Sequence, residues 1–280
     1  MRTEQDPRLA TLPPATAEVG IIPRAGDWLV RAAELLWALT ESDLRFRYGR
    51  GPWRFVRWLL EPVALVGVYL FLVTFVLDKP GTAVGLSLTC SVVPFQLVML
   101  TIGNAMTTLD ARRPTILNMA FRRMFIPISS ALTESAGFAS SLFLLIVMMG
   151  VYEIEPTWNI LWLPLVFLVN LLLAVAAAYA AVLWGIWLRE LRTFVLSFVR
   201  TLFFLGPGLV PLQETSEGVQ HLLRINPLTG LFEAYRDVFL NGERPDAWEL
   251  LYPTAAALIL FAIFVPIYSS EQRHFAKVIG

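Results

Sequence analysis

Charged residues are scarce in this chain of 280 residues: Asp, Glu, Lys and Arg make up 16% of it, whereas hydrophobic residues make up 56%. A soluble protein of ordinary composition has about a quarter charged residues. Together with several apolar runs of about twenty residues, this deficit predicts an all-α membrane protein with several membrane-spanning helices. The formal net charge is zero, so no basic field indicates a nucleic-acid partner.

Cysteine, histidine and lysine are nearly absent. The single cysteine, Cys90, lies in an apolar run, and His221 is far from His274 in the sequence; these facts exclude a disulfide framework and the usual metal motifs. Neither Lys79 nor Lys277 lies in a Gly-Lys-Ser/Thr loop, so we do not expect the chain to bind ATP by that route. No other familiar catalytic motif is found. We therefore expect no catalytic residue, no metal site and no cofactor bound by this chain.

The N-terminal part divides into two segments. Residues 1–27 hold several prolines and few apolar residues, which predicts a disordered cytoplasmic tail. Residues 28–50 place Leu36, Trp37 and Leu44 on one helix face, typical of an amphipathic helix in the inner membrane interface. Asp43 falls on the apolar side of that helix. We interpret it as an ion pair with Arg47, four residues on; a contact with another chain is the alternative.

Residues 51–280 are predicted to form a transmembrane domain with six spans. The apolar runs place these spans at approximately 56–77, 84–106, 127–151, 159–187, 194–212 and 249–270. Most of the 22 Lys and Arg residues fall in segments that are cytoplasmic if the N-terminus is inside, so both termini are predicted to be cytoplasmic.

The segment between the fifth and sixth spans contains a short helix, Ile225 to Leu240, predicted to lie on the outer face. Asn226 followed by Pro227 is a typical helix start. An apolar stripe then follows at helical spacing, whereas the charged residues lie off it; the stripe is Leu228, Leu231, Phe232, Tyr235, Val238 and Phe239, and the charged residues are Glu233, Arg236 and Asp237. This pattern predicts an amphipathic helix at the membrane face or capping the bundle.

Glu61, Glu134 and Arg200 fall within the predicted spans, where ionisable groups are costly and usually paired or functional. Glu61 follows Arg57 by four residues, which suggests an interfacial ion pair. Glu134 and Arg200 are predicted to lie at similar depth, and we hypothesise that they pair and hold the third and fifth spans together. The alternative is that Arg200 extends to the interface by itself.

A set of short motifs follows the predicted topology in order. They are Leu35-Leu36-Trp37-Ala38-Leu39, Asp43-Leu44, Arg47-Tyr48, Pro94-Phe95-Gln96, Arg122-Arg123-Met124-Phe125-Ile126-Pro127, Arg189-Glu190-Leu191-Arg192, Asn226-Pro227 and Glu233-Ala234-Tyr235-Arg236-Asp237. Together they resemble the membrane subunit of type-2 ABC exporters, and most closely the permeases that export lipid-linked polysaccharides such as O-antigen or teichoic acid. Glu61 and Arg122 depart from that pattern, which has Asn and Pro there.

The resemblance implies a homodimer in the bacterial cytoplasmic (inner) membrane, working with two copies of a separate cytoplasmic ATPase that binds the ATP and Mg²⁺. It also implies two functional regions. The residues implied at the ATPase interface are Asp43, Arg47, Arg112, Arg113, Leu117, Arg122 and Arg123. For the loop of residues 112–123, the alternative is a basic segment that only anchors the chain on the cytoplasmic side of the membrane. The residues implied in the outer gate are Asn226, Pro227, Phe232, Glu233, Tyr235, Arg236 and Asp237, with a plain connecting helix as the alternative.

The implied substrate carries a pyrophosphate on a polyprenyl lipid and a sugar chain. Arg45, Arg50 and Arg54 are candidates for the pyrophosphate, because arginine matches phosphate geometry; contact with bilayer phosphates is the alternative. Phe203 and Phe204 are candidates for stacking on sugars along the path, and ordinary packing is the alternative.

Three other functions remain open. They are an ABC exporter of a drug or other lipid, an intramembrane glycan-modifying enzyme such as a glycosyl or acyl transferase, and a structural scaffold. The enzyme would need polar residues clustered at one depth, and the sequence predicts only scattered ones.

Overall fold

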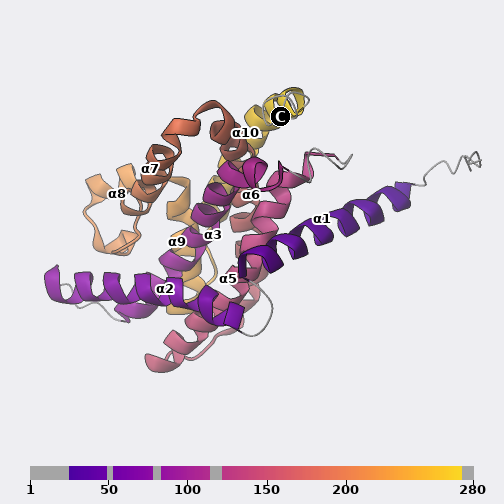
Figure 1. Ribbon diagram of the computed structural model, residues 1–280. Helices are drawn as coiled ribbons and strands as arrows, with labels where there is room; N and C mark the ends of the chain where they lie inside the picture. The colour runs from indigo at the N-terminus through magenta and orange to yellow at the C-terminus, as the bar shows by residue number, and fades with distance from the viewer. Residues whose placement is uncertain (1–24, 49–52, 78–82, 114–121, 273–280) are drawn as a thin grey trace, which may run out of the picture. The chain divides into compact units, whose positions relative to one another are not determined.

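The structure is a computed structural model that describes residues 25–48, 53–77, 83–113 and 122–272 (Figure 1). Every regular element in these ranges is helical, as predicted. The chain divides into two compact units, Met1–Leu35 and Leu36–Gly280. Of the first unit, the structure describes the beginning of α1 (Ala25–Tyr48), a helix that matches the one predicted over residues 28–50. The predicted tail lies almost entirely outside the described residues.

Five helices in the described ranges are long and apolar enough to cross a membrane. They are α2 (Trp53–Phe71) with its π-helical continuation η2 (Leu72–Val76), α3 (Val84–Ala111), α5 (Phe125–Val151), α6 (Leu163–Trp187), which follows the short η3 (Trp158–Trp162), and α10 (Ala247–Glu271). They match the predicted first, second, third, fourth and sixth spans. The several apolar helices therefore make this a multi-pass membrane protein.

The fifth predicted span, residues 194–212, is not one continuous helix. After η4 (Arg189–Leu191), α7 (Arg192–Phe204) ends after 13 residues. That length corresponds to roughly 20 Å, whereas the hydrocarbon core is about 30 Å thick. The chain then turns through Gly206–Gly208 and continues as η5 (Leu212–Glu214) and α8 (Glu217–Leu223). Pro207 between two glycines explains the break, because proline removes a helical hydrogen bond and glycine favours irregular backbone.

Helix α3 is the central element of the larger unit: it packs against α2, α5, α6, α7 and α9 (Figure 1). Most of its side chains are buried. Its crossing with α6 is very close at Gly185, where an added Cβ would lie 2.2 Å from the Met106 carbonyl oxygen. Only glycine fits there, so this residue fixes the distance between the two helices.

Helix α9 (Pro227–Arg236), followed by the π-helical turn η6 (Asp237–Asn241), packs against α3, α6 and α10. Gly230 permits the approach to α10, because a Cβ there would lie 2.8 Å from the Glu249 carbonyl oxygen. The cap of α10 is formed by Asp246 and Glu249, whose side chains reciprocally bond the first turn.

Candidate functional site

Helix α9 forms where the sequence predicts it. The Asn226 side chain accepts a hydrogen bond from the Leu228 backbone N–H at 3.0 Å, which confirms the predicted cap. Its amide also donates to the Leu202 carbonyl at 2.6 Å, so the cap joins α9 to α7. The charged residues of this helix are nevertheless covered by other parts of the chain. Every residue from Leu228 to Arg236 is buried in this chain, with Glu233 and Arg236 only 3% and 1% exposed.

The buried guanidinium of Arg236 is held by hydrogen bonds from three directions. Its Nε donates to Ser87 Oγ at 3.0 Å and its Nη2 to Ser91 Oγ at 2.6 Å, both on α3. Nη2 also donates to the Pro207 carbonyl at 2.6 Å, and Nη1 donates to Glu233 Oε1 at 2.6 Å. A buried charge is tolerated only when it is paired and hydrogen-bonded, and this one is both.

Glu233 extends the same network to the segment after α7. Its Oε1 also accepts a hydrogen bond from the Leu212 backbone N–H at 3.1 Å. Pro207 lies in the break after α7 and Leu212 follows it, so Arg236 and Glu233 hold the irregular segment against α9 and α3. We call these four residues with Ser87 and Ser91 the Arg236 network.

A second polar cluster lies at the other end of α3. The Asp110 carboxylate accepts hydrogen bonds from Arg189 Nη2 at 2.7 Å and Arg192 Nη1 at 2.9 Å. Arg192 also donates from Nη2 to the Gly185 carbonyl at 2.7 Å, at the end of α6. The sequence predicts no role for Asp110; the available signal was an acidic residue beside a predicted cytoplasmic loop rich in arginine. This cluster joins the end of α3 to the turn between α6 and α7.

Two residues predicted at the ATPase interface contact each other. Arg112, the C-cap residue directly after α3, forms an ion pair with Asp43 of α1. The side chain of Arg47, the partner expected for Asp43, lies outside the described residues. Asp43 and Arg112 therefore link α1 to the end of α3 within the larger unit.

The segment that enters α5 is also anchored. Arg123 Nη1 donates to the Gln272 carbonyl at 2.7 Å, while the hydroxyl of Tyr268 on α10 donates to the Arg123 carbonyl at 2.9 Å. Arg113 and Arg122, predicted at the same interface, are exposed. Leu117 lies outside the described residues.

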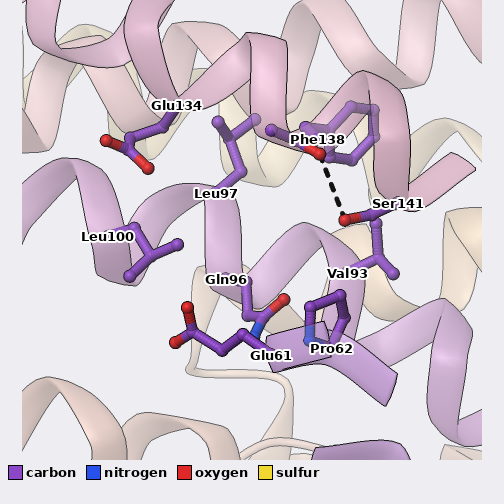
Figure 2. Close-up of a pocket in the computed structure, with 10 residues that line it drawn as sticks. Glu61, Pro62, Val93, Gln96, Leu97, Leu100, Glu134, Phe138 and Ser141 are labelled. Carbon is purple, nitrogen blue, oxygen red and sulfur yellow. Dashed lines mark hydrogen bonds between the residues drawn. The ribbon is translucent and has the colours of Figure 1, made fainter. Parts of the chain in front are cut away.

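Glu61 and Glu134 line one cavity, which corrects the expectation that the charges within the spans are scattered. Figure 2 shows Glu61 and Gln96 on one side of the cavity and Glu134 on the other. The cavity has a volume of about 40 Å³ and lies between α2, α3 and α5. Glu134 accepts a hydrogen bond from Asn104. The Gln96 Nε2 atom is buried and has no hydrogen-bond partner within the described residues.

The predicted pair of Glu134 with Arg200 stays a prediction. Glu134 is buried on α5, and its described hydrogen bond is to Asn104. Arg200 is exposed on α7. The side chain of Arg57, the expected partner of Glu61, is outside the described residues.

The two sugar-path candidates occupy different environments. Phe203 is 1% exposed and packs against Tyr69, Phe95 and Phe232, with ring centroids 5.2, 5.0 and 5.8 Å away. Phe204 is 52% exposed. Phe204 is therefore accessible at the surface of this chain, whereas Phe203 is enclosed by the aromatic cluster; their role on a sugar path stays a prediction.

The pyrophosphate candidates are only partly described. Arg45 is exposed and forms an ion pair with Glu41 on the same helix face. The side chain of Arg54 and the whole of Arg50 lie outside the described residues. Within the part of the chain that the structure describes, no group of three or more His, Cys, Asp or Glu side chains could hold a metal ion.

Several apolar helices packed around a central α3, with polar clusters at both of its ends, define a multi-pass membrane protein. No family model matches the chain. The chain is, however, similar to curated proteins named O-antigen export system permease protein RfbA. It is 26% identical to the one from Myxococcus xanthus and 22% identical to two from Klebsiella pneumoniae, in each case over 88% of this chain and 95% of the relative. These relatives confirm the predicted resemblance to permeases for polysaccharide export, and their names specify O-antigen.

Proposed function

We propose that this chain is the membrane-spanning permease subunit of an ABC transporter that exports a lipid-linked polysaccharide of the O-antigen type. It works as a homodimer with two copies of a separate cytoplasmic ATPase, which binds the ATP and Mg²⁺. It lies in the bacterial inner membrane with both termini in the cytoplasm, and it is a transport subunit rather than an enzyme. The observation that carries this proposal is the similarity to O-antigen export permeases along nearly the whole of both chains.

The end of α3 supports coupling to a cytoplasmic partner. Asp110 and Arg112 lie two residues apart there, and they bond to the turn between α6 and α7 and to α1, respectively. The basic loop proposed to dock on the ATPase begins directly after them. A force applied to that loop would therefore reach both α7 and α1 through ion pairs rather than through apolar contacts alone.

Deletion of the gene in its own bacterium tests the proposal. We expect surface polysaccharide to disappear and lipid-linked polysaccharide to accumulate inside the cell, and we expect the wild-type chain on a plasmid to reverse both effects. Unchanged surface polysaccharide would overturn the proposal. If surface polysaccharide stayed normal while the deletion strain lost drug resistance or the export of another lipid, the chain would instead belong to an ABC exporter of that drug or lipid.

Purification tests whether ATP hydrolysis belongs to a separate subunit. The chain is expected to co-purify with a P-loop ATPase, and the chain by itself is expected to hydrolyse no ATP. Reconstituted vesicles should translocate the lipid-linked glycan only when both subunits and ATP are present. Translocation or glycan modification by the permease alone would contradict the assignment as a transport subunit.

A further inference from the structure

A pocket of about 410 Å³ lies beside the Arg236 network, where α3 begins and α5 ends. Its polar and aromatic lining includes Tyr152, Gln213, Glu214, Glu233, Arg236 and Asn241. We call it the Glu233 pocket. Its volume lies within the range of small-molecule sites, about 300–1,000 Å³. By the predicted topology it opens on the outer side of the membrane.

The pocket has a fixed floor and a polar rim. The floor contains Glu233 and Arg236, which the hydrogen bonds of the Arg236 network hold in place. Tyr152 forms part of the wall, and its hydroxyl accepts a hydrogen bond from the Gly85 N–H at 3.0 Å. Gln213, at the rim, is exposed. Fixed polar groups with one aromatic side chain are the usual means of orienting a small polar ligand.

The charge of the lining disfavours an anionic ligand. Arg236 already donates four hydrogen bonds within the protein, one of them to Glu233, so little of its donor capacity remains. The carboxylates of Glu214 and Glu233 outnumber this single guanidinium. A phosphate would meet a net negative lining with its best donor engaged. Hydroxyl groups, in contrast, can donate to carboxylates and to amide oxygens and accept from amide N–H groups.

We propose that the Glu233 pocket binds an uncharged sugar residue through its hydroxyl groups, and that it does not bind the pyrophosphate of the lipid carrier. The inference rests on the proposed function for the source of the sugar, which is the glycan leaving the transporter. Glu214 and Asn241 hydrogen-bond the hydroxyls at the rim, and Tyr152 packs against the sugar.

Protection of an introduced thiol tests this site. The natural Cys90 is fully buried, so it gives little background labelling. Gln213→Cys places a thiol at the rim, and Glu217→Cys places one on exposed α8, outside the pocket lining. Purified full-length protein of each variant is labelled with a polar maleimide alone, with polysaccharide released from its lipid, or with inorganic pyrophosphate.

We expect the polysaccharide to slow labelling of Gln213→Cys and to leave Glu217→Cys unchanged, while pyrophosphate protects neither. Adding Glu214→Gln or Asn241→Ala to Gln213→Cys should weaken the protection by roughly 3- to 10-fold, about the effect of one hydrogen bond. Equal labelling rates with and without polysaccharide would overturn the inference. So would protection by pyrophosphate as strong as that by the sugar polymer.

Export in cells separates this inference from the proposed function. Glu214→Gln is expected to slow the appearance of surface polysaccharide, and Glu217→Gln, the same change three residues away, is expected to match the wild type. If the gene deletion shows normal surface polysaccharide, the proposed function fails. If wild-type export is confirmed but Glu214→Gln exports normally and the polysaccharide gives no protection, only the pocket inference fails.

Discussion

Arg236 and Glu233 form an ion pair of 2.6 Å on a helix that has no exposed residue between Leu228 and Arg236. Both side chains are almost completely buried, so solvent screens their interaction only weakly. Because the pair also bonds Pro207 and Leu212, it stabilises the irregular segment after α7 as well as α9 itself.

Removal of the guanidinium should be strongly destabilising. Arg236→Met leaves the Glu233 carboxylate buried without its cation, and breaking a buried pair in this way costs about 3–5 kcal/mol. The measurement is thermal unfolding of the purified protein in detergent. Arg244→Met, an exposed arginine in the loop after η6, is the matched control and should change stability by less than about 0.5 kcal/mol.

The double variant Glu233→Gln with Arg236→Met should be more stable than Arg236→Met by itself, because no unpaired buried charge remains. A double variant that loses the sum of the two single effects would show that the two residues act independently. That result would remove the basis for treating them as one pair.

Asp110→Asn should impair coupling more than stability. The ion pairs of Asp110 are partly exposed, with 39% of the aspartate side chain accessible, so their loss should cost less than about 1 kcal/mol.

Mutations at coupling positions alter communication between sites by about 0.5–2 kcal/mol. Export per ATP hydrolysed should therefore fall roughly 2- to 30-fold, measured in vesicles with both subunits. Glu190→Gln, an exposed acidic residue in the adjacent turn, serves as the control, and equal export by the two variants would contradict the assignment.

Gly185→Ala should separate α3 from α6. The added methyl group would lie 2.2 Å from the Met106 carbonyl oxygen, so the helices must move apart, at a cost of about 1–3 kcal/mol. Gly150→Ala on α5 meets no atom within 4 Å and should be neutral or slightly stabilising. The measurement is the melting temperature of each variant, which should fall for Gly185→Ala only. An unchanged melting temperature for Gly185→Ala would show that α3 and α6 leave room for a methyl group at this crossing.

The stability of the protein should depend on pH through Asp237, which lies outside the spanning helices. Burial raises the pKa of Asp237 above its ordinary value of 3.8; hydrogen bonds with Asn241 and Glu249 oppose this effect, and the charges of Glu233 and Asp246 add to it. With a raised pKa, the folded state holds the proton more tightly than the unfolded state. This contribution to stability is complete below about pH 4 and is lost as the pH rises through the folded-state pKa.

Asp237→Asn removes that titration and can still accept a hydrogen bond from Asn241, which donates to Asp237 at 2.8 Å. We therefore expect the melting temperature of the variant to gain on the wild type as the pH rises from about 4. Parallel curves for the two proteins would contradict a raised pKa at this position.

Much of the fold was predictable because apolar runs and their lengths determine where spanning helices can form. The start of α9 was predictable for a local reason, since Asn226-Pro227 is a strong cap signal. The break in the fifth predicted span was not predictable from composition. The run from 194 to 212 is apolar enough to span a membrane, but Pro207 and the glycines beside it end the helix early. Proline elsewhere, as at Pro94 in α3, lies within a continuous helix, so its presence does not decide the outcome.

The site was less predictable because periodicity cannot show what covers a polar helix face. Arg236 lies off the apolar stripe of α9, which in a sequence indicates solvent, yet α3 supplies Ser87 and Ser91 to it. The available signal was two serines four residues apart within an apolar run. The pairing of Asp110 with Arg189 and Arg192 depends on helix packing over about eighty residues of sequence, beyond the reach of any local pattern.

The carbonyl of Pro207 bonds to a side chain that is itself bonded to two serines of α3. The segment after α7 consequently cannot slide past α9 or the first turns of α3 without giving up several buried hydrogen bonds. We therefore expect these three parts to move together as one rigid piece, with bending confined to the chain on either side.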